Sequence, residues 1–457
     1  MSYSVLILDN KTLEQIYALN LKIYTGTDVI FKKNFDEVTK LIGVMPGIEL
    51  IVARDEIDDQ ELGGKIYDFV KENDLNIPVI IYGSSKKYTK IGDFDKFGTF
   101  LTSNTDLRTF VRTCARHLGI TSKDMASKLV PEYLAIPCEY LLLLGKSLSP
   151  LYVKRTEPNT PMSFEKVLAS NAEFTEGDIQ QLVQQGHKYI YIKSSERVKF
   201  VNDYTQKMVV QVLSKAPEEK KMEIMEISTA IILEQLHEIG VDDATLKIAD
   251  SIIAQTVNEV KKEPQFKDFL AKLYRNTESF AFKHIQVITY LSHYIIQNSE
   301  WGTQQHQEKL AYAALFHDMA LTDDNFIAIH TEAQIATHTP KLTKEAQALI
   351  NDHAKRAAEL IQKHAKAPYE VDEIVLQHHG SKTGHGFAKD FPGDLNRLSI
   401  VFIIAEEYAL NLLKATDDPT KLDHQEAIFM LYEKYANKNY QNIIKTLGWM
   451  LLEKKGP

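Results

Sequence analysis

Cysteine is nearly absent from this chain. Its 457 residues include two cysteines, Cys114 and Cys138, and neither belongs to a CxxC pattern. This scarcity argues against a disulfide framework and against a structural zinc finger, both of which depend on cysteine. Such cysteine use is typical of a protein in a reducing compartment.

Long apolar runs and an excess of positive charge are also lacking. No apolar run approaches about 18 residues, so we expect no transmembrane helix. The first residues, MSYSVLILDN, lack the basic segment and apolar core of a signal peptide. The net charge of −9 argues against a general binding surface for nucleic acids or anionic membranes. It does not exclude the binding of a small anionic ligand. We therefore expect a cytoplasmic protein that binds neither DNA nor membranes.

The sequence predicts a multidomain protein that begins with an α/β domain. A chain of 457 residues holds roughly two to four domains at about 100–200 residues each. The short apolar runs SVLILD, ELIVA and PVIIYG alternate with amphipathic stretches such as Glu61–Asn73. This alternation is typical of buried parallel strands and their connecting helices. It predicts a doubly wound α/β domain over residues 1–122.

Two further domains are expected after the first. In residues 128–205, LYVKR and KYIYIK resemble strands, and Thr175–Gln185 resembles a helix that Thr175 caps and Gly186 stops. This pattern predicts a small α+β module. Residues 216–457 carry apolar residues at helical spacing, as in Ile224–Glu238, and Pro264 breaks the next segment. The last domain is therefore predicted to be an all-α bundle.

Histidine is concentrated in one stretch of the chain. Eleven of the fifteen histidines lie between His284 and His385, where His317-Asp318 and His378-His379 form adjacent pairs. Neutral imidazole nitrogens and carboxylate oxygens suit iron, manganese or zinc. The pattern therefore indicates metal-dependent hydrolysis.

The candidate ligands fall on the apolar faces of predicted helices. One histidine on such a face is more often a hydrogen-bonded core residue than a ligand. A buried carboxylate such as that of Glu406 is costly unless a cation or a donor meets it, and a bundle interior is a usual place for a metal site. Several independent placements favour a metal site with the ligands His284, His317, Asp318, His353, His378, His379 and Glu406. The other histidines are interpreted as ordinary, with His330 and His385 as the exceptions to watch, because each lies near a motif loop.

These residues and motifs resemble a known family. The series His284, LFHDMAL, NDHAKRAAELI, LQHHGSKTGHGF and IIAEEYAL is similar to the HD-GYP subgroup of the HD phosphohydrolase superfamily, over roughly residues 220–450. The resemblance implies an HD-type bundle that holds two or three ions, often iron or manganese, and hydrolyses the bacterial second messenger cyclic di-GMP. It implies that His317 and Asp318 form the catalytic pair. Bound ions would polarise a phosphodiester oxygen and lower the pKa of a bridging water.

The chain departs from the family pattern at several positions. Leu321 stands where the family has lysine, Gly380 where it has glutamate, and Glu406 where it has aspartate. The family's Gly-Tyr-Pro becomes Gly386-Phe387-Ala388, in which Phe387 keeps a ring able to stack on guanine. Lys382 or Lys389 is a candidate for the missing phosphate contact. Loss of one preorganised donor typically lowers a rate about 10²–10³-fold.

Three hypotheses about function follow from these departures. The first is a slow metal-dependent phosphodiesterase for cyclic di-GMP, which the ligand set favours. The second is a catalytically inactive sensor or scaffold that keeps the site to bind metal or nucleotide. The third is a phosphohydrolase of another cyclic dinucleotide.

The first domain resembles the receiver domain of two-component signalling, but its phosphorylation site is degenerate. Asp9-Asn10 stands at the acidic pair, whereas Gly83 replaces the Thr or Ser and Ser103 replaces the Lys. The acceptor position falls on Arg54, and Asp55 comes one residue late. We therefore expect no phosphoacceptor, with phosphorylation of Asp55 as the lesser alternative. A receiver-like fold would then serve homodimerisation or the docking of a protein partner.

Overall fold

The computed structural model describes residues 3–8, 10–57, 60–83, 97–102, 105–121, 132–142, 144–155, 163–239, 241–277, 279–321, 323–338, 340–415 and 423–451. Asp9 and Ser103, named above, lie outside the described residues. The chain divides into two compact units, Met1–Val212 and Leu213–Pro457. The finer division of the first unit into residues 1–122 and 128–205 stays a prediction.

The first unit contains a five-stranded parallel sheet at the N-terminal end of the chain, as predicted. Its strand order is β2-β1-β3-β6-β7, the order of flavodoxin-like doubly wound domains. The strands are β1 (Tyr3–Ile7), β2 (Asp28–Phe31), β3 (Ile48–Arg54), β6 (Val79–Gly83) and β7 (Gly98–Thr102).

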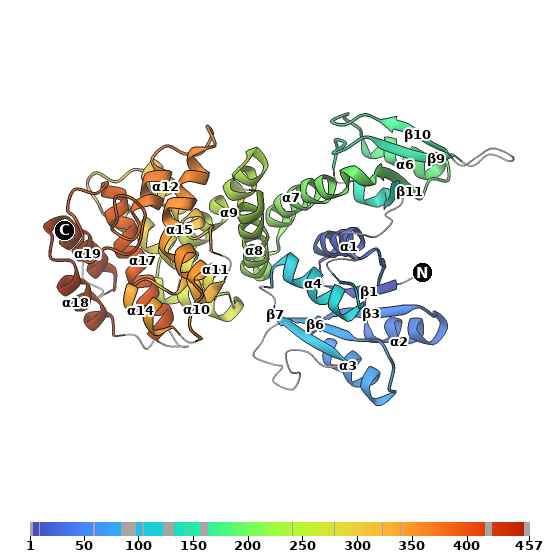
Figure 1. The fold of residues 1–457 in the computed structure, drawn as a ribbon, viewed down its shortest axis with the longest axis horizontal. Helices are drawn as coiled ribbons and strands as arrows, with labels where there is room; N and C mark the ends of the chain where they lie inside the picture. Colours follow the sequence, from blue (N-terminus) through green and yellow to red (C-terminus); the bar gives the residue numbers. More distant parts are fainter. Residues whose placement is uncertain are drawn as a thin grey trace. The chain divides into compact units, whose positions relative to one another are not determined.

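Helices cover both faces of this sheet (Figure 1). They are α1 (Lys11–Thr25), α2 (Phe35–Val44), α3 (Gly63–Glu72) and α4 (Leu107–His117). Tyr17 of α1 meets Tyr82 of β6 through a hydroxyl contact of 2.8 Å and packs edge-to-face on Phe110 of α4. On the other face, Phe35 of α2 and Phe69 of α3 pack edge-to-face at 5.8 Å. Apolar side chains that point to both faces of the strands make this two-sided packing favourable.

Two local features of this sheet concern the start of α3 and the position of Asp55. The helix expected over Glu61–Asn73 begins at Gly63, because Glu61 pairs in a short hairpin of β4 (Glu56–Ile57) and β5 (Gln60–Glu61). Asp55 is buried directly after β3, and its carboxylate accepts the backbone N–H of Glu56 at 2.8 Å. It packs so closely on Gly83 that a Cβ there would lie 2.0 Å from the carboxyl carbon. This burial favours the hypothesis that Asp55 is not a phosphoacceptor.

The first unit also contains a four-stranded antiparallel sheet in the order β10-β9-β11-β8. Its elements are β8 (Tyr133–Pro137), β9 (Leu151–Arg155), β10 (Ser163–Leu168), α6 (Glu176–Gln184) and β11 (Tyr189–Lys193), followed by α7 (Arg197–Lys215). Thr175 caps α6 in a capping box with Asp178, and Gly186 follows at φ +91°, as the sequence predicts.

The described part of the second unit is helical. Its helices are α8 (Lys221–Ile239), α9 (Asp243–Lys262), α10 (Phe266–Asn276), α11 (Phe280–Gln297), α12 (Gln304–Phe316), α13 (Asp324–Ile327), α14 (Glu332–Thr337), α15 (Lys344–Gln362), α16 (Val371–Gln377), α17 (Arg397–Ala415), α18 (His424–Lys434) and α19 (Lys438–Leu451). The helix α11 packs against α12 and α17, and α16 packs against α12, α15 and α17. These five helices enclose the site described below.

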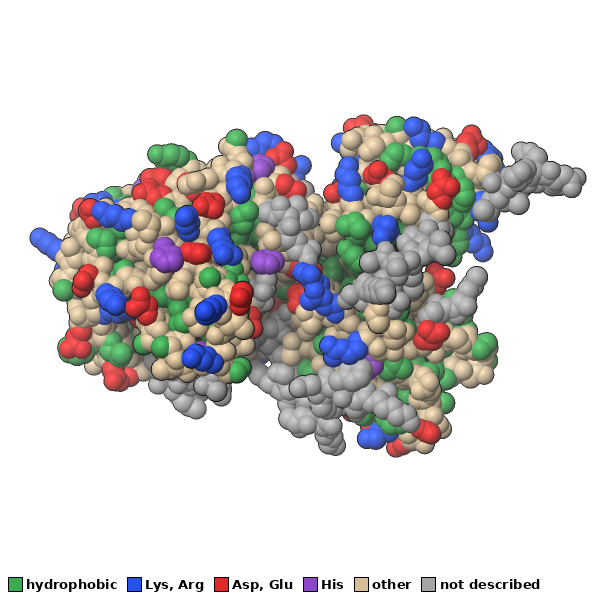
Figure 2. All heavy atoms as spheres, viewed as in Figure 1, with side chains coloured by type: hydrophobic (Ala, Val, Ile, Leu, Met, Phe, Trp, Pro, Cys, Tyr) green, Lys and Arg blue, Asp and Glu red, His purple; other side chains and the backbone are tan. Residues whose placement is uncertain are grey.

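Two properties concern the described helices and the visible surface. No helix among the described residues combines the length and apolar character needed to cross a membrane. Figure 2 shows acidic and basic side chains interspersed over the visible described face, rather than a continuous basic stripe of the kind that duplex binding uses.

Candidate metal centre

The structure brings all seven predicted ligands together inside the second unit. His284 lies on α11, His353 on α15 and Glu406 on α17, each on the buried side of its helix. His317 and His378 cap the C-terminal ends of α12 and α16, and each is followed by a further candidate, Asp318 or His379. All seven residues are buried. The packing of five helices therefore brings residues that are distant in the sequence into one cluster.

The two carboxylates stand between imidazoles. Asp318 Oδ2 is 3.0 Å from His317 Nε2, and Asp318 Oδ1 is 3.3 Å from His353 Nε2. Glu406 Oε1 lies 3.5 Å from His317 Nε2, 3.9 Å from His284 Nε2 and 4.0 Å from His378 Nε2. Each oxygen of Asp318 thus faces a different imidazole ring.

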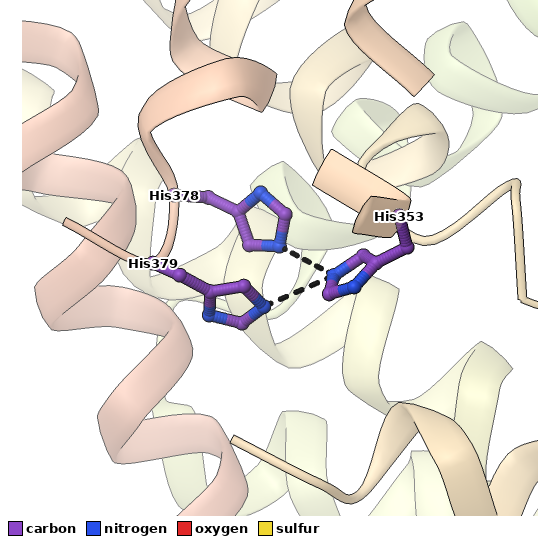
Figure 3. A group of neighbouring side chains, drawn as sticks. All are labelled: His353, His378 and His379. Atoms are coloured by element: carbon purple, nitrogen blue, oxygen red, sulfur yellow. Dashed lines mark hydrogen bonds between the residues drawn. The ribbon is translucent and has the colours of Figure 1, made fainter. Parts of the chain in front are cut away.

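Three histidines converge at one end of the cluster (Figure 3). His353 Nε2 lies 3.2 Å from His378 Nε2 and 3.0 Å from His379 Nε2. Two other groups also place one donor atom of each member within 4.8 Å of the others. They are His284, His317 and Asp318, and His284, His330 and Glu406.

The backbone orients three of the imidazoles. The Nδ1 atoms of His317, His353 and His378 lie 2.9, 2.5 and 2.6 Å from the carbonyl oxygens of Ala314, Ile350 and Val375. A carbonyl oxygen can only accept, so each Nδ1 carries a proton, and in the neutral ring Nε2 presents a lone pair. Such outer contacts fix the tautomer and the orientation of metal-binding histidines.

Burial sets the charge state of the cluster. It lowers the pKa of His284 to about 3 and holds the pKa of His378 and His379 well below the ordinary range. Burial, with the charge of Asp318, raises the pKa of Glu406 well above its ordinary value. Neutral imidazoles keep their lone pairs, and a nearby cation would favour the ionised form of Glu406.

The unpaired polar atoms show that a cation fits here. Within the described residues, both ring nitrogens of His284, His317 Nε2, both oxygens of Asp318 and Glu406 Oε1 are buried without a hydrogen-bond partner. Each buried acceptor left without a partner costs about 1–3 kcal/mol. Divalent ions would satisfy several of these atoms at once. A nitrogen and oxygen donor set without cysteine suits iron, manganese or zinc.

A pocket of about 390 Å³ opens onto this cluster. His378, His379 and Glu406 form part of its wall, so a molecule in the pocket would contact these candidate ligands directly. Aromatic and charged side chains form much of the rest of the wall, among them Phe387, Phe391, Tyr435, Lys389, Lys434, Glu332 and Glu407. The pocket therefore combines surfaces for a planar ring with cations for a phosphate.

Of the three residues predicted to bind substrate, two line the pocket and one does not. Phe387 lines the pocket, with its ring 4.6 Å from that of His379. Lys389 also lines the pocket, and its ammonium lies 3.2 Å from a carboxylate oxygen of Glu332. Lys382 instead pairs with Asp394 at 2.5 Å and does not belong to the pocket wall.

Two residues of the site lie outside the sequence motifs. The sequence marks His330, with His385, as an exception among the ordinary histidines, because each lies near a motif loop. Lys434, at the end of α18, lies outside every motif and follows no pattern that relates it to the histidines. Its ammonium is 2.8 Å from Glu407 and stands over the rings of Phe391 and Tyr435.

Local packing explains two departures from the family pattern. Leu321 is buried in an apolar cluster with Ile327 and Ile350, against which Phe387 also packs. At Gly380, where φ is +76°, a Cβ would lie 2.6 Å from the ring of Phe391. The surroundings of both positions are therefore fitted to the residues present here rather than to lysine and glutamate.

Comparison with known proteins gave one similar structure. No family model and no curated protein matches the sequence. The structure search found a chain described as Bd1817, a HDG"Y"P protein from Bdellovibrio bacteriovorus, with 17% sequence identity and a TM-score of 0.36. The match covers 70% of this chain and 99% of that one. A TM-score this low establishes no relationship, and the function must be inferred from the site itself.

Proposed function

We propose that this chain is a metal-dependent phosphohydrolase of the HD type, with cyclic di-GMP as its substrate. The observation that carries the proposal is the convergence of buried, unpaired acceptor atoms from five helices beside a pocket. His284, His317, Asp318, His353, His378, His379 and Glu406 would hold two or three iron or manganese ions.

The chemistry divides between the ions and the chain. Bound transition-metal ions act as Lewis acids and bring the pKa of a water molecule close to neutrality. The chain's part is to hold the ligands in one tautomer and to position the dinucleotide. Phe387 offers a face for a base, and Lys389 and Lys434 offer charge to the phosphates.

We expect the reaction to be slow. Leu321 places an apolar side chain where the family pattern has a cation, and Lys389 and Lys434 are already paired with Glu332 and Glu407. Loss of one preorganised donor typically lowers a rate about 10²–10³-fold.

One sample can test both metal binding and turnover. The protein is purified without oxygen, its metals are counted by elemental analysis, and cyclic di-GMP hydrolysis is followed over time. We expect two or more ions per chain and a linear dinucleotide product. The double variant His317→Ala/Asp318→Ala should lose both. Turnover no greater than that of this variant would refute the enzymatic proposal.

A second candidate is a sensor that binds metal and nucleotide without turnover. The burial of Leu321 and the exclusion of any side chain at Gly380 by Phe391 favour it. Bound metal with nucleotide binding but no product would support this candidate. A panel of other cyclic dinucleotides distinguishes this sensor from a phosphohydrolase of different specificity. The phosphohydrolase would cleave one of them, and the sensor would cleave none.

We also propose that residues 1–122 serve homodimerisation or the docking of a protein partner. The parallel sheet with its buried Asp55 supports a receiver-like fold used without phosphorylation. Light scattering on the full chain and on an Asp55→Asn variant tests this. We expect both to have the same mass, twice that of one chain if the contact is homodimeric.

A further inference from the structure

His330 lies in the buried cluster, although it is not part of any of the sequence motifs. It follows the short helix α13, and its side chain is 9% exposed. Its ring centroid is 6.1 Å from that of His284 and 4.7 Å from that of His379. Together with Glu406, His330 forms part of the pocket wall.

The backbone holds one nitrogen of His330 and turns the other toward the cluster. Nε2 lies 3.0 Å from the carbonyl oxygen of Ile327, three residues earlier. Nε2 must therefore carry the proton, and Nδ1 presents a lone pair. His317, His353 and His378 make the same contact to a carbonyl three residues earlier, but through Nδ1. The two nitrogens of His330 therefore exchange the roles that they have in the other three rings. In each case one lone pair faces the cluster.

The atom that faces His330 Nδ1 is a carboxylate oxygen. Glu406 Oε1 lies 3.9 Å away, too far for a hydrogen bond, and has no such partner in the described parts of the chain. His284 Nε2 is 3.9 Å from the same oxygen and is likewise unpaired. Ligand atoms bound to one ion at about 2.0–2.2 Å lie roughly 3–4 Å apart. A cation is the occupant that makes this convergence favourable.

We infer that His330, with Glu406 and His284, forms a metal subsite on the pocket side of the centre. The subsite takes a divalent transition-metal ion such as Mn²⁺ or Fe²⁺, which nitrogen and oxygen ligands suit. The inference rests on the proposed metal-dependent function and adds to it a ligand outside the family pattern. Because His330 and Glu406 line the pocket, this subsite borders the space that an entering phosphate would occupy.

Metal counting in full-length variants tests this assignment. His330→Ala and the larger His330→Leu remove the ring, and His385→Ala is the matched control, since that histidine is 66% exposed and pairs with Asp352. Each protein is dialysed against a series of Mn²⁺ concentrations and analysed for bound metal. Visible absorption of Co²⁺-loaded samples reports the ligands independently of activity. We expect both His330 variants to lose one ion per chain, or to bind it at least about 10-fold more weakly. The control should match the wild type in both measurements.

The outcomes separate this inference from the proposed function. If either His330 variant is folded by circular dichroism and binds as many ions as the wild type with equal affinity, the inference is wrong. The proposed function then stands as long as the wild type binds metal and hydrolyses substrate. If the wild type itself binds no metal, the inference and the proposed function fail together.

Discussion

Leu321 is a residue whose packing bears on the proposed function. A lysine at this position would be expected to assist phosphate binding, yet Leu321 contributes to an apolar cluster with Ile327, Ile350 and Phe387. We predict that Leu321→Lys destabilises the protein by roughly 2–3 kcal/mol, because an ammonium group in an apolar cluster loses its hydration. Urea denaturation of the variant and the wild type measures this change. Leu321→Met, which conserves volume, should cost less than about 1.5 kcal/mol.

The same two variants test whether replacing Leu321 alone is enough to restore the function of the family's lysine. We expect no gain of hydrolysis in Leu321→Lys, because the surrounding apolar side chains do not guide an ammonium group toward the pocket. A Leu321→Lys protein that is as stable as the wild type and faster would show that the lysine position is still functional. The apolar cluster would then not be the reason for the slow reaction that we expect.

Phe387 combines a structural contact with a predicted binding contact. Its ring lines the pocket and also packs against the apolar cluster that contains Leu321. Stacking of a base on an aromatic ring contributes about 1–3 kcal/mol. We predict that Phe387→Leu, which keeps the apolar packing, weakens cyclic di-GMP binding about 10-fold, whereas Phe387→Tyr retains it. Isothermal titration with the nucleotide measures both, and equal affinities would exclude stacking on this ring.

At the scale of elements, a buried carboxylate joins three helices of the second unit. Glu259 on α9 is 2.8 Å from Lys272 on α10 and 3.1 Å from both Lys221 on α8 and Lys262. Its side chain is 1% exposed, so removal of its charge leaves three ammonium groups without their shared partner. We predict that Glu259→Gln lowers the free energy of unfolding by about 1–3 kcal/mol at pH 7. Glu263→Gln, at a more exposed partner of Lys272, should cost less than about 1 kcal/mol.

The effect of Glu259 should depend on pH. Burial raises the pKa of this carboxyl, but hydrogen bonds from Lys272, Lys262 and Lys221 outweigh burial and lower it from 4.5 to about 2. A lowered pKa in the folded state stabilises the protein fully above pH 4.5, and this contribution is lost as the pH falls toward 2. The difference in stability between the wild type and Glu259→Gln should therefore shrink over this range. Denaturation curves of both proteins between pH 7 and pH 3 measure it, and a constant difference would contradict the assignment.

The sequence predicted the elements whose periodicity is strong and the ligands that those elements carry. The helical spacing around His284, His353 and Glu406 indicated which face would be buried, and the structure places these side chains on that face. His330 follows a helix of one turn, where no periodicity exists to show its orientation. Lys434 contributes to the pocket through tertiary packing of α18, which local patterns do not encode. The metal roles of all these residues stay predictions.

At the scale of the whole molecule, the proposed metal centre is confined to one of the two compact units. The described candidate ligands lie in Leu213–Pro457, and the first unit has its own apolar core between the parallel sheet and its helices. A chain built from separate compact units need not unfold in one step. Metal binding should therefore stabilise the second unit selectively.

Metal removal provides the test of this selectivity. At a metal concentration 100-fold above Kd, one bound ion adds about 2.7 kcal/mol to the stability of the folded state. For a unit of this size, that corresponds to a fall in Tm of roughly 5–10 °C when a chelator removes the ion. We predict that calorimetry of the full chain shows one transition that moves on chelation and one that does not. In His317→Ala/Asp318→Ala, the chelator should have little effect on either transition. If chelation shifted both transitions equally, the two units would unfold together. If chelation shifted neither transition, the result would contradict the metal centre, because ions that bind only the folded state must stabilise it.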